Sequence, residues 1–531
     1  MMKMRSSATK LAFLVALATL ATQILVHRIV SAKFLNNYAF LVISLTMMGF
    51  ACSGIILSKR LQRFMDSFNE SVSVCVACFV LSLLLITVLF YHITIGSQEP
   101  TSRGEFIKTF LFNIPLALLY SIPFIFCGLI LGVLLSSKNF PTSQIYFFDL
   151  LGSALGAFLV LPAIHWFGVE VSLLLFCTLI LLGAWILFPP RKKKFHGLTL
   201  VTLCILVSSF YFRETTFSMT YPKGSMLASS GFKLLHTAWD PIARIEFSRY
   251  DEQILSAERF LFPCLIGGNH TFHQKFKRIL TQNNYAFTFA LDYDGKKESL
   301  TGIEETIYAA AYQTRAVPNP KVLVIGVGGG FDLLTALYFE ALDITGVEIN
   351  SATLTILEKT YKWYFGYLVE NPKVHLIHGE GRHFLSSHPQ KFDIIQISGV
   401  DTYSGTSACA NIFSENYLYT TEAIQLYFSK LTENGILNLM RLEFPSSPRE
   451  MLRALTTTVS ALRELGIPEP ESHIAMLTTP KGNFTALLLK KNPFTVEEMK
   501  HLGQWTLNNE YITISAVPME EARLQSVYQI F

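Results

Sequence analysis

The chain has few charged residues, and this shortage limits the class of protein that it can be. Asp, Glu, Lys and Arg make up 15% of its 531 residues, whereas hydrophobic residues make up 51%. Soluble domains usually contain about 25% charged residues, so a wholly soluble protein is not expected. The length is well above the size at which one hydrophobic core stops growing, and it therefore predicts at least two domains.

Cysteine and histidine lack the spacing that a disulfide framework or a metal site requires. Six of the eight cysteines lie within apolar stretches, where they act as small hydrophobic side chains. The other two, Cys264 and Cys409, are far apart. Four histidines gather around one expected strand end, but no Cys or Asp completes a ligand set, so we expect no metal. These are His375, His378, His383 and His388.

A basic surface is missing from the C-terminal part. Residues 1–212 contain 15 Lys and Arg against 6 Asp and Glu, which leaves 28 against 33 for residues 213–531. Phosphate binding requires a basic face, so the mildly acidic C-terminal part argues against a nucleic-acid partner. The basic excess of residues 1–212 is typical of the short cytoplasmic loops of a membrane protein.

Long apolar runs fill the first 212 residues. A helix needs about 20 apolar residues to cross a bilayer; the first six runs reach this length and the seventh is short. We therefore predict a transmembrane domain of six or seven helices over residues 1–212, with the lipid bilayer as its partner. The runs are residues 11–30, 35–57, 71–95, 106–135, 143–166, 168–188 and 197–212.

Small and acidic residues within these runs suggest how the helices pack. Glycines four residues apart, at Gly128/Gly132 and Gly152/Gly156, let two helix backbones approach closely. Asp149 lies at the start of the fifth run, where an acid is either functional or simply at the interface. The runs show no clear internal repeat, so a transporter fold has no positive support.

From residue 213 the pattern changes to short strands and helices. Residues 240–250 and 285–291 resemble strands, and Asp294-Gly295 is a hairpin-turn signal, which predicts a linker and small β subdomain over residues 213–300. In residues 301–531 apolar strands alternate with helices, and this predicts a Rossmann-like α/β domain with a parallel sheet. Helices are expected at 303–316, 331–341, 351–368 and 420–431.

The strongest candidate site is a glycine-rich turn that follows the apolar strand Val322–Ile325. Without Cβ atoms, glycines allow the backbone to adopt positive φ and to approach a ligand. The helix that follows presents free N–H groups at its start. The spacing is GxGxG rather than GxGxxG, so a dinucleotide is not the obvious ligand. The cofactor-binding residues predicted here are Gly326, Gly328, Gly330 and Asp332.

Two neighbouring strand ends extend this site. Glu348 closes the next strand, 22 residues after Gly326, and an acid there can accept hydrogen bonds from both ribose hydroxyls. Glu380 and Gly381 follow the third strand at the same edge of the sheet. Glu380 is either a contact for an adenine amino group or a solvated turn acid.

Residues from about 235 to 480 resemble the spermidine synthase (aminopropyltransferase) family, and the whole chain resembles its bacterial membrane-bound relatives. Val324 supports this family over ordinary methyltransferases, which usually carry an acid two residues before the first glycine. The matching stretches are Leu291–Gly295, Glu304–Tyr308, VLVIGVGGG, GVEIN and GEGRHFL.

The resemblance implies a β subdomain before a class I S-adenosylmethionine-dependent transferase fold. It also implies decarboxylated S-adenosylmethionine, or S-adenosylmethionine, as co-substrate, a small amine as acceptor, and a homodimer as one possible assembly. The residues that it implies as contacts to the nucleoside are Gly326, Gly328, Glu348 and Glu380, with Tyr308 facing the amine.

The chain departs from this family where the amine should bind. The family places its catalytic Asp in a loop after the fourth strand, but this chain reads Gln396–Tyr403 there, and Asp401 is the one acid nearby. Asp401 is either the catalytic base or a loop-capping residue. Glu298 and Ala310 also replace a Gln and a Glu of the family pattern. The predicted catalytic residues are Asp401 and Tyr308.

Three functions fit these observations. The leading one is a membrane-anchored aminopropyltransferase, and the alternatives are a methyltransferase and a non-catalytic nucleotide sensor coupled to a membrane module. We expect an integral protein of a bacterial inner membrane. The basic loops predict which side of the bundle is cytoplasmic. If the run 197–212 crosses, the C-terminal domain lies outside the cytoplasm. If it is re-entrant, the domain is cytoplasmic, which is expected because S-adenosyl nucleotides are made there.

Overall fold

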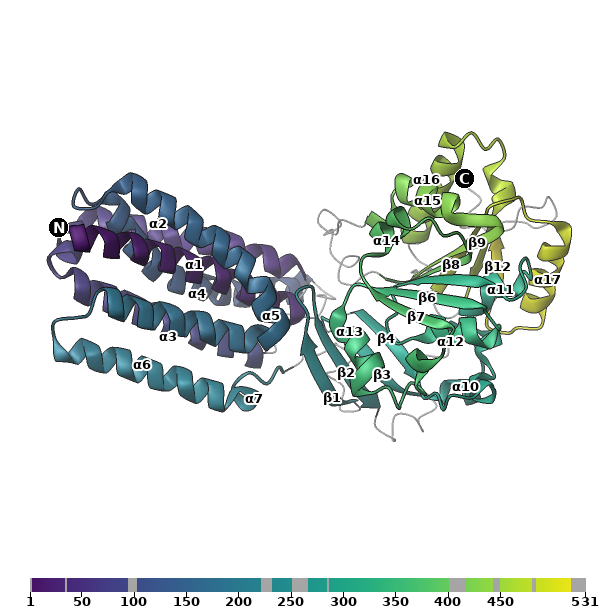
Figure 1. Ribbon diagram of the computed structural model, residues 1–531, viewed down its shortest axis with the longest axis horizontal. Helices are drawn as coiled ribbons and strands as arrows, with labels where there is room; N and C mark the ends of the chain where they lie inside the picture. The colour runs from purple at the N-terminus through teal and green to yellow at the C-terminus, as the bar shows by residue number, and fades with distance from the viewer. Residues whose placement is uncertain are drawn as a thin grey trace.

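The computed structural model describes residues 2–33, 36–93, 103–220, 232–250, 266–283, 286–400, 417–442, 449–479 and 484–516. A bundle of long helices makes up the first 211 residues, and an α/β part lies beyond one end of this bundle (Figure 1). The boundary predicted at residues 212 and 213 falls between helices α6 and α7 (Arg213–Thr216).

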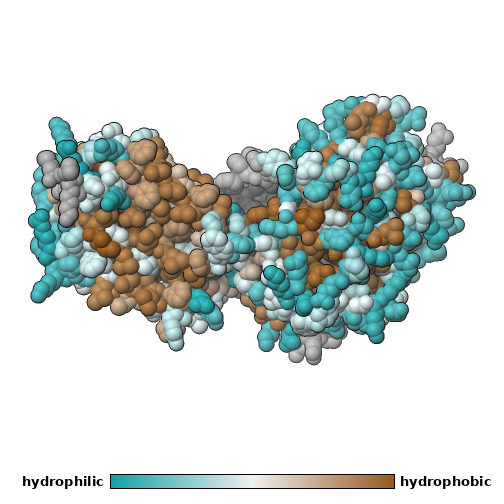
Figure 2. All heavy atoms as spheres, viewed as in Figure 1, coloured by the Kyte–Doolittle hydropathy of each residue, from teal (hydrophilic) through white to brown (hydrophobic). Residues whose placement is uncertain are grey.

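Six helices of the bundle are long and apolar enough to cross a membrane, judged by length and composition. Apolar side chains cover much of the visible flank of the bundle, whereas the α/β part is largely hydrophilic on this face (Figure 2). Such a surface is normal for helices that face lipid and unusual for a soluble protein. The helices are α1 (Met2–Lys33), α2 (Asn36–Asp66), α3 (Phe68–His92), α4 (Arg103–Ser136), α5 (Thr142–Leu187) and α6 (Lys193–Tyr211).

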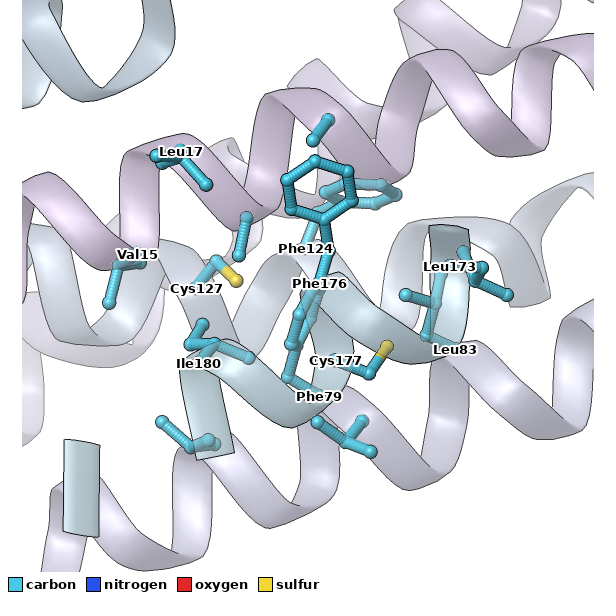
Figure 3. Packing of buried hydrophobic residues seen from close by; sticks show 14 of the residues in the cluster. Val15, Leu17, Phe79, Leu83, Phe124, Cys127, Leu173, Phe176, Cys177 and Ile180 are labelled. Carbon is cyan, nitrogen blue, oxygen red and sulfur yellow. The ribbon is translucent and has the colours of Figure 1, made fainter. Parts of the chain in front are cut away.

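The cysteines of the bundle are packed as the sequence predicts. Cys127 and Cys177 are fully buried and lie among apolar side chains that include Phe79 and Phe124 (Figure 3). The cysteines that the structure describes in this part are free thiols rather than disulfides. The buried ones, Cys75, Cys127 and Cys177, fill space in the helix contacts as small hydrophobic groups do, whereas Cys204 is exposed on the bundle surface.

Helix α5 is two helices joined by a sharp turn at Gly168, whose φ of 76° and ψ of 174° are not helical. Gly152 packs on Phe13 of α1, and Gly183 packs on the adjacent Leu14. Gly152 and Gly183 are therefore at the same level along α1. The chain reverses its direction at Gly168, and the two predicted runs 143–166 and 168–188 lie side by side.

Helix α6 follows the full length of the bundle. Near its start, His196 Nδ1 accepts a hydrogen bond from Trp185 Nε1 (2.9 Å). Just beyond its end, the carbonyl of Thr216 lies 3.1 Å from Nε2 of His92, the last residue of α3. The seventh predicted run therefore extends along the whole bundle, as the other long helices do. With the two arms of α5 counted separately, the described part of the bundle contains seven helical segments side by side.

Most basic residues of the bundle lie at the end away from the α/β part. The rings of Phe140 and Phe188 both contact Phe68 there, next to the loops that the sequence marks as basic. Eleven of the 15 Lys and Arg of residues 1–212 belong to the start of α1 and to the connections α2–α3, α4–α5 and α5–α6, which lie at this end: Lys3, Arg5, Lys10, Lys59, Arg60, Arg63, Lys138, Arg191, Lys192, Lys193 and Lys194.

The β subdomain is a four-stranded antiparallel sheet of order β1-β2-β3-β4. Its strands are β1 (Phe232–Trp239), β2 (Arg244–Tyr250), β3 (Phe276–Gln282) and β4 (Ala286–Leu291). The hairpin signal at Asp294-Gly295 proves wrong, since the hairpin joins β3 to β4. Asp294 Oδ1 instead accepts a hydrogen bond from the Lys296 amide in a turn that precedes a 3₁₀ helix, Lys297–Leu300.

The second sheet has eight strands in the order β12-β10-β11-β9-β8-β5-β6-β7. Its centre is parallel, as predicted, but β10, β11 and β12 are antiparallel, so the sheet is mixed. The strands are β5 (Lys321–Ile325), β6 (Asp343–Glu348), β7 (Val374–His378), β8 (Phe392–Ser398), β9 (Leu431–Leu442), β10 (Ile474–Thr478), β11 (Phe484–Lys490) and β12 (Thr513–Ala516).

Two predicted helices are shorter than their patterns suggest. The segment 303–316 forms 3₁₀ turns and a single α-turn, α11 (Ala310–Gln313). The segment 351–368 is helical only to Thr360: Tyr361 leaves helical geometry with φ of −127°, and Gly366 and Tyr367 further on adopt positive φ. The longer helices around the sheet are α12 (Phe331–Tyr338), α13 (Ser351–Thr355), α14 (Gly381–Ser387), α15 (Thr421–Lys430), α16 (Arg449–Glu464) and α17 (Val496–Leu507).

The turn between β1 and β2 joins the bundle to the α/β part. Trp239 Nε1 donates to Glu170 Oε1 (2.8 Å), two residues after the bend of α5. The next residue, Asp240, accepts hydrogen bonds at Oδ2 from the Ser351 amide (2.9 Å) and hydroxyl (2.6 Å). Ser351 is the first residue of α13, so this turn contacts the helical bundle on one side and α13, beside the second sheet, on the other.

Candidate functional site

A cavity of about 220 Å³ lies at the carboxyl ends of β5, β6 and β8, with residues of β3 and β4 on its other side. This is the edge at which open α/β sheets bind their ligands. The cavity gathers most of the residues predicted from the sequence: Tyr308, Gly326, Gly328, Asp332, Glu348, Glu380 and Gly381. Gly330 does not line it; this residue caps α12 instead, with φ of 77°.

The glycine turn needs its glycines for conformation and for space. Gly326 and Gly328 have φ of 82° and 50°, in the left-handed region that side chains disfavour. A Cβ at Gly326 would overlap Val400, and one at Gly329 would overlap the carbonyl oxygen of Phe289 in β4. The glycines therefore hold the turn close to both β8 and the β subdomain while exposing its backbone to the cavity.

Glu348 is fixed against this turn. Its Oε2 accepts a hydrogen bond from the Gly328 amide (3.0 Å), and its Oε1 accepts one from the Asn350 amide (2.9 Å). The side chain is only 5% exposed. Oε1 also accepts a longer hydrogen bond (3.3 Å) from Asn350 Nδ2. Each carboxylate oxygen has two lone pairs, so Oε2 can still accept a hydrogen bond from one ribose hydroxyl, and a second hydroxyl would replace the Asn350 side chain on Oε1.

The β subdomain contributes residues that the sequence pattern did not single out. Gln282 Oε1 accepts a hydrogen bond from Asn350 Nδ2 (3.2 Å), next to Glu348. A Cβ on Gly328 would lie 3.1 Å from Thr288 Cγ2, so β4 also packs on the glycine turn. Only the three-dimensional arrangement brings these residues to the site, because they precede the turn by some 40 residues.

Glu380 is the N-cap of α14. Its carboxylate accepts hydrogen bonds from the amides of Arg382 (2.9 Å) and His383 (2.7 Å), which is the usual role of an acid at a helix start. Gly381 packs on Ile325 with no room for a Cβ. Both residues line the cavity, and their hydrogen bonds and packing also give them a structural role.

Asp332, Tyr308 and Ser398 form the other side of the cavity. Asp332 is 5% exposed, and its Oδ1 accepts a hydrogen bond from Ser398 Oγ (2.8 Å). Burial raises the pKa of Asp332 to about 7, although the Ser398 hydrogen bond acts in the opposite direction. The ring of Tyr308 packs edge-on against Phe331, with 4.7 Å between centroids. Burial raises the pKa of the Tyr308 phenol too, so this hydroxyl is neutral at physiological pH.

The shifted pKa of Asp332 predicts a pH-dependent stability. The folded state holds this proton more tightly than the unfolded chain, whose Asp titrates near 3.8. The free energy of unfolding should therefore fall as the pH rises towards 7. Asp332→Asn removes this pH dependence. Between pH 5 and 7.5, the free energy of unfolding of the unsubstituted protein should therefore fall by on the order of 3 kcal/mol relative to that of the variant. Thermal unfolding at several pH values measures this, and parallel curves for the two proteins would contradict it.

Two further predictions concern Asp401 and a metal ion. Asp401 lies outside the described residues, so its role stays a prediction. Within the described ranges, no three His, Cys, Asp or Glu side chains are grouped as metal ligands would be.

Comparison with known proteins relates the C-terminal part to one enzyme family. No protein-family profile matches the chain. Polyamine aminopropyltransferase 2 of Pseudomonas aeruginosa is 24% identical over 193 residues, which cover 35% of this chain and 53% of that protein. Polyamine aminopropyltransferase of Korarchaeum cryptofilum is 27% identical over 123 residues, 23% of this chain and 36% of that protein. The chain thus spans about half or less of these relatives.

The solved structures that are similar to the chain include spermidine synthases and methyltransferases, at lower sequence identity. A spermidine synthase in complex with the transition-state analogue AdoDATO is 16% identical, with a TM-score of 0.35, and the match covers 50% of this chain and 76% of that one. The curated relatives confirm the resemblance to the spermidine synthase family that the glycine turn and its neighbouring motifs indicate.

Proposed function

Because its C-terminal part is spermidine synthase-like, we propose that the chain is a membrane-anchored transferase for an S-adenosyl nucleoside, and that it moves an aminopropyl group to an amine. One observation carries the proposal: a single cavity contains the glycine turn, the Glu348 carboxylate held against it, and a buried acid with a tyrosine on the opposite side. The first two fit a nucleoside, and the last two fit an amine.

The nucleoside half of the cavity is preorganised. The Glu348 carboxylate is aligned by two backbone amides and is ready to accept the ribose hydroxyls. The Gly326–Gly330 turn allows the adenosyl group to lie against bare backbone. Holding a sulfonium carbon in line with an incoming amine can supply a large part of a rate enhancement by orientation alone. The proposed co-substrate is therefore decarboxylated S-adenosylmethionine, or its parent compound, without a metal.

The full chain, purified in detergent, provides the test. Isothermal titration calorimetry with decarboxylated S-adenosylmethionine, S-adenosylmethionine and methylthioadenosine should show binding of at least one of them. Incubation with putrescine should release methylthioadenosine, the product of aminopropyl transfer. Release of S-adenosylhomocysteine would instead indicate a methyltransferase. Nucleoside binding without any product would favour a sensor, and no binding would refute the proposal.

We also infer the orientation of the chain from its seven passes. Lys and Arg collect in short cytoplasmic loops, and eleven of the 15 in residues 1–212 lie at the bundle end away from the α/β part. This distribution supports a non-cytoplasmic α/β part. It weighs against the expected cytoplasmic location, which depends on where the co-substrate is made. In the inferred orientation, the co-substrate must be supplied to the non-cytoplasmic side.

Protease accessibility in sealed vesicles tests this orientation. In right-side-out vesicles, trypsin should cleave the α/β part without permeabilisation, whereas cleavage at Arg191–Lys194 should require it. The two cleavage sites act as controls for each other within one chain. Protection of the α/β part in intact right-side-out vesicles, with cleavage only in inverted ones, would reverse the assignment.

A further inference from the structure

The cavity contains one acid whose function neither the nucleoside site nor the fold accounts for. Three acids line it: Asp332, Glu348 and Glu380. Glu348 holds the glycine turn and Glu380 caps α14, each through backbone amides. Asp332, in α12, accepts a hydrogen bond from the hydroxyl of Ser398, a neutral side chain at the end of strand β8.

Among the residues that the structure describes, no cationic side chain pairs with the buried Asp332. None of the ion pairs between described residues includes it. The titratable groups that face it are the buried phenols of Tyr308 and Tyr312, both neutral because burial raises their pKa values. An unpaired carboxylate in such a place is costly, and a ligand that brings a positive charge would relieve this cost.

Its position also fits an amine. Asp332 lies in the first turn of α12, directly after the glycine turn, and Ser398 lies at the end of the adjacent strand β8. Tyr308 lines the cavity beside Asp332 and packs against Phe331, so an aromatic face borders the acid. Aromatic rings and a carboxylate together are a common environment for ammonium groups.

From this geometry we propose that Asp332 binds the acceptor amine and takes its proton before the transfer. This assignment rests on the proposed function and gives it a base among the described residues. Ser398 is then a positioning residue: its hydroxyl holds Oδ1 of Asp332 at the β8 end of the cavity.

The proton and the electrons balance as follows. The Asp332 carboxylate removes one proton from the ammonium group and becomes a carboxylic acid. The free nitrogen lone pair attacks the methylene carbon bonded to the sulfonium, a C–N bond forms, and the C–S bond breaks. Its electron pair goes to sulfur and gives the neutral thioether methylthioadenosine. The product leaves as a secondary ammonium ion, and Asp332 returns its proton to solvent.

The environment of Asp332 suits this step. General base catalysis is most efficient when the pKa of the base lies near the working pH, and burial moves the pKa of Asp332 to about 7. A carboxyl with an ordinary pKa would be a far weaker base. The bound cation would in turn favour the ionised carboxylate, so amine binding below pH 7 should release a proton from Asp332.

The test uses the full chain in detergent and the variants Asp332→Asn, Ser398→Ala and Asp401→Asn. In Asp332→Asn, turnover with putrescine should fall about 10²–10⁴-fold, while the Kd for methylthioadenosine should change by less than about threefold. Ser398→Ala should lower turnover less than Asp332→Asn does, and it should shift the pH profile of turnover to higher pH, because it removes a hydrogen bond that lowers the pKa of Asp332. Calorimetry in buffers of different ionisation enthalpy, at pH 6, should show proton release on putrescine binding that Asp332→Asn lacks.

The outcomes separate this inference from the proposed function. If methylthioadenosine binds and Asp332→Asn keeps its turnover while Asp401→Asn loses it, the base is Asp401 and the inference is wrong. If Asp332→Asn loses nucleoside binding as well, Asp332 is part of the nucleoside site and the inference is again wrong. If the unsubstituted protein binds no S-adenosyl nucleoside, the proposed function fails first and the inference with it.

Discussion

Replacing Glu348 with alanine is expected to weaken binding of methylthioadenosine by about 100-fold or more. A hydrogen bond to a charged group contributes about 1.5–3 kcal/mol, and the carboxylate is placed to accept one from each ribose hydroxyl. The variant also removes the acceptor that holds the Gly328 and Asn350 amides, so the turn loses part of its order. Isothermal titration calorimetry on the full chain in detergent measures the effect.

A matched control comes from the opposite edge of the same sheet. Glu433 is exposed near the start of β9, whose carboxyl end pairs with β8 at the cavity. Glu433→Ala should bind the nucleoside as the unsubstituted protein does, and Glu348→Ala should unfold at a temperature within a few degrees of it. Equal affinity in the Glu348 variant would show that the ribose is held elsewhere.

Alanine at both Gly152 and Gly156 should disrupt the helical bundle. A Cβ at Gly152 would overlap the Phe13 carbonyl oxygen, and one at Gly156 would lie 2.5 Å from that of Leu17. Both obstacles are backbone atoms, which cannot rotate away, so α1 and α5 must separate. Overpacking usually costs 1–3 kcal/mol per site and occasionally more, and the pair should lose about 3 kcal/mol or more. Thermal unfolding and size-exclusion chromatography in detergent report the loss.

Gly54→Ala is the control for this prediction. Gly54 is also in the middle of a bundle helix, but no atom lies within 4 Å of an added Cβ there. This substitution should be neutral or slightly stabilising, because alanine favours a helix by about 1 kcal/mol over glycine. If the double variant behaves like Gly54→Ala, then α1 and α5 do not pack as closely as described.

The parts of this molecule that sequence could predict depend on short stretches of chain. The strand before Gly326, the glycine turn and the acid at Glu348 are encoded within about 25 residues, and the structure brings them to one cavity. The apolar runs are likewise encoded by residues that are neighbours in the chain. The seventh run, residues 197–212, is short by itself, but the helix that contains it begins four residues earlier, at Lys193.

The parts that sequence could not predict depend on distant partners. Asp332 belongs to the glycine motif, and for this reason it was predicted to bind the cofactor. Its burial and its bond to Ser398, 66 residues away in the chain, suggest a different role. The 351–368 segment had a helical pattern, but Phe247 of β2 packs against Tyr361, Tyr364 and Phe365, and the helix gives way to tight turns.

The turn between β1 and β2 has a consequence for how the two halves of the chain affect each other. Trp239 is anchored to Glu170 beside the bend of α5, and the adjacent Asp240 is anchored to Ser351, three residues after Glu348. A tilt of the α5 bend would thus act on the loop after Glu348 through only two residues, Trp239 and Asp240. Linkage is reciprocal, so if the proposed nucleoside fixes this loop, it would also favour one arrangement of the bundle helices.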